Sequence, residues 1–379
     1  MSQKSRELKA QGIDVISLSL GEPDFNPPTH VLEAGKSAID GDFNHYPPVP
    51  GYMDLREAIS NKFKEQNGLD YSPNQIVVST GAKQAIANLV LSLVNPGDEV
   101  ILLSPFWVSY QALVQLAEAD VKHVHADISN DFKVTPDQLD EAITEKTKLI
   151  MFSSPSNPTG GSYSYEDMAA LAKVVGKHKH VVAMADEIYE HITFEGEHVS
   201  LASFPEVENQ VVTVNGVSKA YAMTGWRIGY IGAPLDIAKA CAKMQGQFTS
   251  GANSIAQRAA IAALSTSKED LNKQRDVFRS RRDLVVSLFA AVNGFETNVP
   301  SGAFYLFPKV VEVFGKSTTG WEINSSSNLC NYLLEVAHVA AVPGEAFGAP
   351  GYIRLSYAAS ETELREAARR IKEAVNALS

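Results

Sequence analysis

The sequence has 379 residues, of which 45% are hydrophobic, so the chain can bury a substantial core and a mainly disordered protein is excluded. Its 33 basic and 44 acidic residues give a formal net charge of -11, and no long run of Lys or Arg is present. Such an acidic surface repels nucleic acid and anionic lipid, so we expect neither as a partner.

The first residues, MSQKSRELKAQG, predict a polar helix that lacks the apolar core of a signal peptide. No window of the sequence approaches the roughly 18 consecutive apolar residues of a membrane span. The two cysteines, Cys241 and Cys330, show neither CxxC spacing nor the Cys/His cluster of a zinc site. We therefore expect a cytoplasmic protein in a reducing compartment, without a metal site.

Short apolar runs separated by helix-length amphipathic segments come next along the chain. One such segment has Ile86, Leu89, Val90 and Leu93 at helical spacing and ends at an Asn-Pro-Gly-Asp turn. This alternation predicts an α/β fold with a mostly parallel sheet and helices on both of its faces. The predicted strands are residues 74–80, 98–104, 148–154, 180–186, 210–215 and 227–233.

The C-terminal part has a different pattern. Ser360 and Glu363 have the spacing of a capping box, and Leu364, Ile371 and Val375 form one apolar face of a last helix. We predict a large domain over residues 41–290 and a smaller α+β domain over 1–40 and 291–379. The other elements expected here are a long charged helix over 267–292, strands at 302–308 and 352–358, and a polar surface loop over 316–328.

Unusual polar residues directly follow several predicted strands, and ligands of open parallel sheets bind beyond these strand ends. Thr80, Gly81 and Ala82 lead from a strand into a helix, where free N–H groups could bind a phosphate. An ordinary helix start is the alternative. Asn157 lies between two prolines that would fix the direction of its amide, or that would simply form a rigid surface turn.

Asp186 ends an apolar strand close to Tyr189, and a carboxylate there needs a cationic or hydrogen-bonding partner unless it only caps a helix. Lys219 lies among small and apolar residues that could lower its pKa, so that the neutral amine forms a Schiff base. Arg227, eight residues later, offers a fork for phosphate. Each cation alone could be an ordinary surface residue. Their combination with an acid, a phenol and an amide on successive strand ends favours one site.

The stretch GVSKAYAMTGWRIG, residues 216–229, resembles the signature around the cofactor lysine of the class I aminotransferases, pyridoxal-phosphate (PLP) enzymes of the aspartate aminotransferase type. The resemblance implies fold type I, with a seven-stranded, mostly parallel sheet in the large domain. It covers nearly the whole chain through LGEPDFNPP, YPPVPGYMDLREAI, TGAKQAI, SPFWVSY, SPSNPTGG, ADEIYE, PSGAFY, VPGEAFG and YIRLSYA.

Carried onto this chain, the resemblance implies that Lys219 holds PLP as a Schiff base and moves the proton between the substrate Cα and the cofactor. Asp186 would pair with the pyridine nitrogen and make the ring an electron sink. Tyr189 and Asn157 would hydrogen-bond the phenolic oxygen of the ring. Trp107 would stack on the ring face, where it also borders the substrate.

The resemblance also assigns the phosphate and the substrate carboxylate. Gly216 stands where some relatives have a phosphate-binding serine, so Ser218 or the backbone would replace that contact. Arg354 would clamp the α-carboxylate, with Asn157 and Gly21 assisting. The phosphate would be bound by Gly81, Ala82, Ser218 and Arg227, with Tyr46 coming from the other subunit of a homodimer with shared active sites.

Lys83 is the candidate for substrate choice, and it borders the phosphate-binding turn. It lies where the most similar branch of the family uses a lysine for the distal carboxylate of the substrate. The segment 243–253, from which another branch takes an arginine, contains none. We therefore predict a ping-pong aminotransferase for aspartate and 2-oxoglutarate. The alternatives are an aminotransferase for aromatic amino acids or prephenate, a lyase of the same fold, and a sensing domain that binds PLP without turnover.

Overall fold

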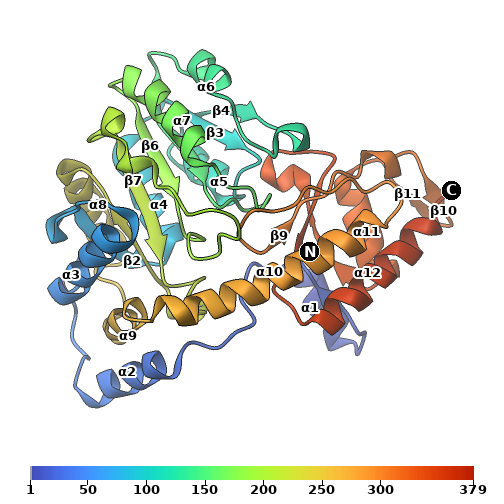
Figure 1. The fold of residues 1–379 in the computed structure, drawn as a ribbon, viewed down its shortest axis with the longest axis horizontal. Coiled ribbons are helices and arrows are strands. Elements are labelled where there is room, and N and C mark those ends of the chain that lie inside the picture. Colours follow the sequence, from blue (N-terminus) through green and yellow to red (C-terminus); the bar gives the residue numbers. More distant parts are fainter. Residues whose placement is uncertain (1) are drawn as a thin grey trace.

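The computed structural model describes residues 2–379, and its central feature is a seven-stranded sheet (Figure 1). The strands lie in the order β2-β8-β7-β6-β5-β3-β4, and all pairs are parallel except those that β8 makes with β2 and β7. The predicted sheet is thus confirmed. Its strands are β2 (Ile76–Thr80), β3 (Glu99–Ser104), β4 (Asp120–His125), β5 (Thr147–Ser153), β6 (Val182–Asp186), β7 (Val211–Gly216) and β8 (Ile228–Gly232).

Helices cover both faces of this sheet, as the alternating pattern predicts. On one face, Ile86 and Leu89 of α4 are fully buried in a cluster with Val100 and Val212 of the strands. On the other face, Leu171 of α7 belongs to a second buried cluster. The first face carries α4 (Ala82–Leu93), α5 (Ser109–Leu116) and α8 (Leu235–Phe248), and the second carries α6 (Pro136–Ala142) and α7 (Tyr165–Lys177).

The N-terminal residues contact both parts of the molecule. α2 (Thr29–Asp40) packs against α9 (Ser254–Leu264), beside the large sheet, where α3 (Met53–Lys62) also lies. In contrast, β1 (Ile16–Ser17) pairs in parallel with β12 (Val339–Ala340), close to α1 (Ser2–Ala10). The domain boundaries at residues 40 and 290 stay a prediction.

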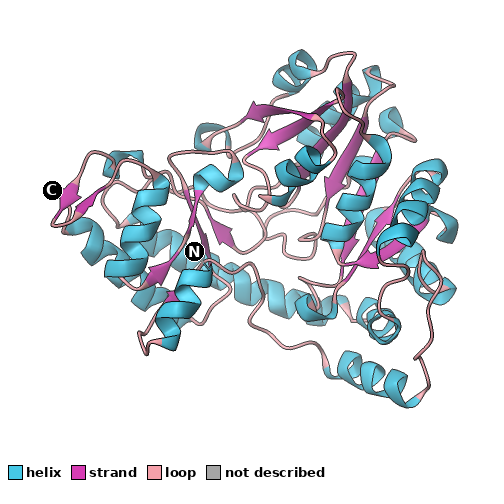
Figure 2. Cartoon of the chain, turned by 180° about the vertical axis from the view of Figure 1, so that it is seen from behind, coloured by secondary structure: helices cyan, strands magenta, loops and turns pink. Residues whose placement is uncertain are grey.

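A second body is built on the C-terminal half of the long helix α10 (Lys268–Ala290), which runs from α9 toward it (Figures 1 and 2). It contains a three-stranded antiparallel sheet in the order β13-β14-β9. The predicted capping box of α12 is present, because Ser360 and Glu363 exchange side-chain-to-backbone hydrogen bonds. Its elements are β9 (Tyr305–Leu306), α11 (Ser326–Val336), β13 (Val342–Pro343), β14 (Ile353–Ser356) and α12 (Glu361–Asn376).

The polar stretch 316–328, predicted as a surface loop, is more structured than expected. It contains the antiparallel hairpin of β10 (Ser317–Thr318) and β11 (Trp321–Glu322) and the first turn of α11. Ser325 caps that helix by accepting a hydrogen bond from the Asn328 N–H. The loop prediction is wrong here because serine and asparagine serve as turn and cap residues as readily as loop residues.

Short single-turn helices connect these elements, and within residues 2–379 no helix combines the length and the hydropathy needed to cross a membrane. The single-turn helices are η1 (Phe63–Asn67), η2 (Pro73–Gln75), η3 (Ile128–Asn130), η4 (Leu201–Ser203), η5 (Pro205–Val207), η6 (Thr224–Trp226), η7 (Val311–Val313) and η8 (Gly344–Phe347).

Candidate active site

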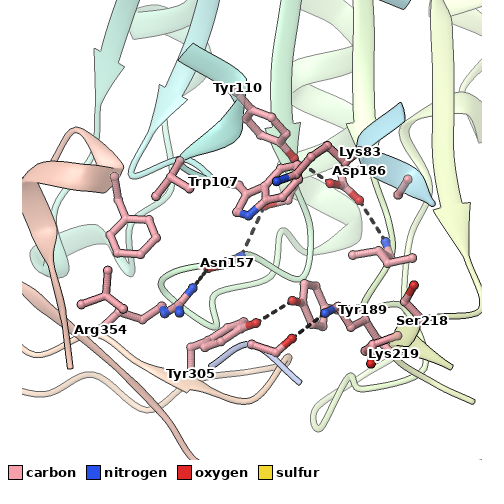
Figure 3. Close-up of a pocket in the computed structure, with 18 of the residues that line it drawn as sticks. Lys83, Trp107, Tyr110, Asn157, Asp186, Tyr189, Ser218, Lys219, Tyr305 and Arg354 are labelled. Carbon is pink, nitrogen blue, oxygen red and sulfur yellow. Dashed lines mark hydrogen bonds between the residues drawn. The ribbon is translucent and has the colours of Figure 1, made fainter. Parts of the chain in front are cut away.

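A cavity of about 350 Å³ lies beyond the carboxyl ends of β5, β6 and β7 and is bordered on its other side by the second body (Figure 3). Ser153, Asp186 and Val214 are register partners, so these three strands end side by side. The cavity collects most of the residues singled out from the sequence. These are Gly21, Ala82, Lys83, Trp107, Asn157, Asp186, Tyr189, Ser218, Lys219, Arg227 and Arg354.

Asp186, the last residue of β6, presents a buried carboxylate to this cavity. The Tyr110 hydroxyl donates to its Oδ2 at 2.8 Å, and the Ile188 N–H donates to its Oδ1 at 3.2 Å. Burial raises the pKa of Asp186 to about 6, while these two hydrogen bonds and the charge of Lys219 limit the rise. Asp186 is therefore a carboxylate at neutral pH that can hold a cationic partner.

Lys219 follows the end of β7 and points into the cavity with its amine. The Nζ atom donates to the Gly21 carbonyl oxygen at 2.6 Å. Burial lowers the pKa of Lys219 to about 8, and the nearby charges of Arg354 and Arg227 act in the same direction. A substantial fraction of this lysine is thus a neutral amine near pH 8, which is the state that a nucleophile or a general base requires.

Arg354, on β14 of the second body, reaches the cavity across from Asp186. Its Nη1 donates to Asn157 Oδ1 at 2.9 Å, and its Nη2 donates to the Ser19 carbonyl at 2.7 Å. Only 7% of the residue is exposed, and the Nε–H has no hydrogen-bond partner. Such a buried guanidinium, held by neutral oxygens without a carboxylate, retains its capacity to bind an anionic ligand.

The N-terminus of α4 and Arg227 together form an anion-binding corner. Gly81 precedes the helix with φ +81°, and a Cβ built there would lie 2.2 Å from Arg227 Nη2. Gly229 is equally constrained, because its Cβ would lie 2.1 Å from the Ala82 nitrogen. The two glycines let the guanidinium approach the free N–H groups of the helix, and both features attract a phosphate.

Lys83 and Trp107 lie together at another side of the cavity. The Lys83 Nζ lies 5.0 Å from the centroid of the Trp107 ring, a distance that suits a cation–π contact. The indole also meets Tyr110 edge to face, with ring centroids 5.5 Å apart. Trp107 is thus held as an aromatic wall of the cavity, with an exposed ammonium above it.

Two predicted residues do not line the cavity of the single chain. Gly81 stands behind the Arg227 guanidinium, as described above. Tyr46 is 96% exposed. Tyr46 is not among the residues that line this cavity within the single chain.

The sequence patterns missed two tyrosines of the cavity, Tyr110 and Tyr305. The hydroxyls of Tyr189 and Tyr305 are hydrogen-bonded at 2.7 Å, and a Cβ at Gly21 would lie 2.4 Å from the Tyr305 hydroxyl. Tyr305 also stacks with Arg354, whose guanidinium carbon is 4.6 Å from the ring centroid. Both tyrosines end stretches that carry the family resemblance, SPFWVSY and PSGAFY, and this is the signal that could have found them.

Comparison with known proteins places these observations in a family. The model of the family "Aminotransferase class I and II" matches residues 13–371. The chain therefore belongs to the class I and II aminotransferases, which are PLP-dependent enzymes.

Relatives agree with this membership along almost the whole length of this chain. A protein of Petunia hybrida described as a bifunctional aspartate aminotransferase and glutamate/aspartate-prephenate aminotransferase is 46% identical, over 99% of this chain and 79% of its own length. The crystal structure of the aspartate aminotransferase from Rhizobium meliloti is 44% identical, with a TM-score of 0.96 over 100% of this chain and 95% of that one. The aspartate aminotransferase from Thermus thermophilus with maleate is 40% identical, with a TM-score of 0.92 over 98% and 95%.

Proposed function

We propose that this protein is a PLP-dependent aminotransferase that exchanges an amino group between aspartate and 2-oxoglutarate. The observation that carries the proposal is the pairing, in one cavity, of a lysine with a lowered pKa and a buried aspartate, Lys219 and Asp186. The relatives named above support the dicarboxylate substrate, because both solved structures are described as aspartate aminotransferases.

The residues of the cavity fit each chemical part of PLP. The Lys219 amine suits the aldehyde, and the Asp186 carboxylate suits a protonated pyridine nitrogen. The corner of Ala82 and Arg227, together with Ser218, suits the phosphate. Tyr189 and Asn157 would meet the phenolic oxygen, and Trp107 would cover one ring face. When bound, PLP supplies an electron sink that makes the Cα proton of an amino acid acidic.

The protein residues then carry out the binding and the proton transfer. Arg354 binds the α-carboxylate of the substrate through its planar fork and so fixes the orientation of Cα. The Lys219 Nζ removes the proton from Cα, and its pKa of about 8 is close to the pH at which such a base is most effective. Asp186 stays ionised because Tyr110 and Ile188 donate to it.

A panel of amino acids tests the proposal directly. Each one is added without an oxo acid to the purified protein loaded with PLP, and the loss of the lysine-bound absorbance is followed. Aspartate and glutamate should convert the cofactor to pyridoxamine phosphate, recovered from the protein by chromatography. Release of a keto acid with unchanged PLP would indicate a lyase instead, and absorbance changes without any product would indicate a sensing domain.

A second candidate substrate is prephenate, because the Petunia relative is described as using it. Prephenate and 2-oxoglutarate both carry a 2-oxo acid group and a second carboxylate. Arg354 and Lys83 could therefore bind either one. Adding each of them to the pyridoxamine form of the protein would distinguish the two. Faster return of the PLP absorbance with prephenate would make it the preferred acceptor.

Replacing Lys83 with methionine tests the source of dicarboxylate specificity. Methionine keeps an unbranched side chain over Trp107 but removes the positive charge. We expect kcat/KM for aspartate to fall about 10- to 100-fold, the cost of losing one charged partner of a carboxylate. Phenylalanine as the amino donor is the internal control, because it lacks the distal carboxylate. The kcat/KM value for phenylalanine should fall less than about threefold. Equal losses for both donors would remove Lys83 from the specificity argument.

The homodimer and the role of Tyr46 form the last part of the proposal. Tyr46 is 96% exposed in the single chain, so its side chain is accessible to a second copy of the chain, as the family resemblance implies. Light scattering should give twice the mass of one chain. Replacing Tyr46 with phenylalanine should weaken PLP binding about 10-fold through loss of one hydrogen bond to the phosphate.

Mixed dimers distinguish a shared site from a merely dimeric protein. A chain with Tyr46→Phe and a chain with Lys219→Ala, refolded together, would form one site with both native residues only if Tyr46 acts across the interface. Tight PLP binding should then return in one of the two sites of each mixed dimer. If mixing restores nothing, Tyr46 acts within its own chain or not at all.

A further inference from the structure

A buried carboxylate, Glu190, lies next to the cavity but outside its lining, one residue after Tyr189. It forms an ion pair with Lys62 of α3, and their side chains are 5% and 2% exposed. Burial alone would raise the pKa of Glu190, but the charges of Lys62, His191 and His198 outweigh burial and hold this pKa far below its usual range. An apolar pair could often replace a buried ion pair without loss of stability, so stability alone does not explain it.

The carboxylate of Glu190 connects three separate segments of the chain. Its Oε1 accepts hydrogen bonds from Lys62 and, at 2.8 Å, from Asn215 Nδ2. Its Oε2 accepts from Asn67 Nδ2 at 2.7 Å, and the Asn67 Oδ1 accepts from Lys62 at 2.7 Å. Lys62 and Asn67 therefore anchor the carboxylate at the end of α3 and η1.

Asn215 is the connection to the lysine of the active site. It lies in β7, four residues before Lys219, and its Oδ1 accepts from the Gly216 N–H at 2.7 Å, which fixes the direction of its amide. The Asn215–Glu190 hydrogen bond thus joins the segment that carries Lys219 to the segment that carries Tyr189. In the cavity itself, the Lys219 Nζ lies 5.8 Å from the centroid of the Tyr189 ring.

A metal site is the other use that this cluster suggests. Glu187, Glu190 and His198 each place one ligand atom within 4.8 Å of the others. However, Lys62 already pairs with Glu190, while His198 Nε2 and Ser200 Oγ contact Glu187 at 3.0 and 2.7 Å. Each carboxylate has its counter-charge or donor in the protein, so the contacts favour an internal polar network over an ion.

The geometry points to Glu190 as a positioning residue that, through Asn215, fixes the Tyr189 turn and the Lys219 loop relative to one another, anchored by Lys62 and Asn67. The role depends on the proposed function, in which Tyr189 and Lys219 both contact PLP. A displacement of about 1 Å between reacting groups can slow catalysis about 100-fold. The largest charge effects on Lys219 come from Glu22, Arg354, Arg227 and Asp186, whereas the contact of Glu190 with the Lys219 segment is the hydrogen bond from Asn215.

Replacing Asn215 with alanine removes this connection without changing the identity of any residue that lines the cavity. When the Tyr189 hydroxyl donates to the phenolic oxygen of the cofactor, it favours the deprotonated form of the lysine-bound cofactor. A displaced Tyr189 should therefore raise the pKa of the lysine-bound cofactor. We expect the pH midpoint of the lysine-bound absorbance of the holoenzyme to rise by about 0.5 unit or more. The kcat value should fall about 10-fold, with KM within about twofold of the wild type.

Asn88→Ala is the matched control. Asn88 lies in the middle of α4 and is 2% exposed, like Asn215. Its Nδ2 donates one side-chain hydrogen bond of 3.0 Å, to the Oε1 atom of Gln245 in α8. Both alanine variants should lower the melting temperature to a similar extent. Only Asn215→Ala should shift the absorbance midpoint, and only there should hydrogen exchange of the amides 187–191 and 216–221 accelerate together.

A charge-free version of the anchor separates placement from electrostatics. The double variant combines Lys62→Met with Glu190→Gln. Without the lysine, the Asn67 Oδ1 atom has no donor from residue 62 and can accept from the amide of the new glutamine. The oxygen of that glutamine can still accept from Asn215. This variant should keep the wild-type midpoint within about 0.2 unit. Glu190→Gln alone should be unstable, because it leaves the buried Lys62 without a counter-charge.

The outcomes separate this inference from the proposed function. If the wild-type protein shows no lysine-bound absorbance with PLP, the proposed function fails. If the wild type behaves as proposed but Asn215→Ala and Asn88→Ala give the same midpoint and the same exchange pattern, Glu190 has only a structural role and the inference is overturned. A midpoint in the double variant that moves as far as in Asn215→Ala also overturns it.

Discussion

Replacing Lys219 with alanine is expected to lower kcat on the order of 10⁴-fold, because the variant loses both the amine that binds the cofactor and the base that acts on Cα. The pKa of about 8 makes this amine available at neutral to slightly alkaline pH. Borohydride reduction followed by intact-mass measurement should attach the cofactor covalently to the wild type and not to the variant. The absorbance of lysine-bound PLP should disappear together with this adduct.

Lys177→Ala is a suitable control, since Lys177 is exposed and pairs only with Asp140 on the surface. Its activity and its reducible adduct should match those of the wild type. The rate of the Lys219→Ala variant should rise when a small primary amine is added, because a free amine can partly replace the missing base. A cofactor adduct that persists in Lys219→Ala would assign the cofactor to another lysine.

Much of the fold follows from patterns that are local in the sequence. Apolar runs identify the central strands because β3, β5, β6, β7 and β8 are buried almost throughout. The same criterion misses β4, whose sequence DVKHVH is interrupted by charged residues because the strand lies at the sheet edge and is largely half-buried or exposed. Edge strands lack the continuous apolar signal of strands that are covered on both faces.

Local patterns likewise predict some residues of the site and miss others. Asp186 and Asn157 could be predicted because Asp186 ends one strand and Asn157 follows another, and the ends of these two strands meet at one edge of the sheet. Arg354 could not be placed there without the resemblance, because it comes from the second body and reaches Asn157 across 197 residues of sequence. The Glu190 network is equally non-local, joining Lys62 to a residue 128 positions away. No local pattern reports which distant donors a carboxylate will meet.

Replacing Asp186 with asparagine is the second change for which we expect a very large loss, about 10³-fold in kcat. Asparagine has the same shape and can still accept from Tyr110, but it removes the negative charge that would keep the pyridine nitrogen protonated. PLP should still bind to Lys219, so borohydride should still form the covalent adduct. The defect would thus lie in proton removal from Cα, which is measured by the isotope effect of Cα-deuterated aspartate.

The protonation of Asp186 gives a matching pH dependence. Its pKa is raised to about 6, so the carboxylate gains a proton as the pH falls through 6 and loses its attraction for a cationic nitrogen. PLP affinity of the wild type should therefore decrease below about pH 6, and that of Asp186→Asn should not show this step. Tyr110→Phe removes one donor to the carboxylate, and its step should move to higher pH.

A cofactor methylated at the pyridine nitrogen distinguishes charge from shape. The methylated ring carries its positive charge permanently, so it does not need a carboxylate to stay cationic. In Asp186→Asn, this analogue should restore a substantial part of the lost rate, whereas in the wild type it should give no gain. If the variant is equally slow with both cofactors, Asp186 acts by holding the ring in place and not by maintaining its charge.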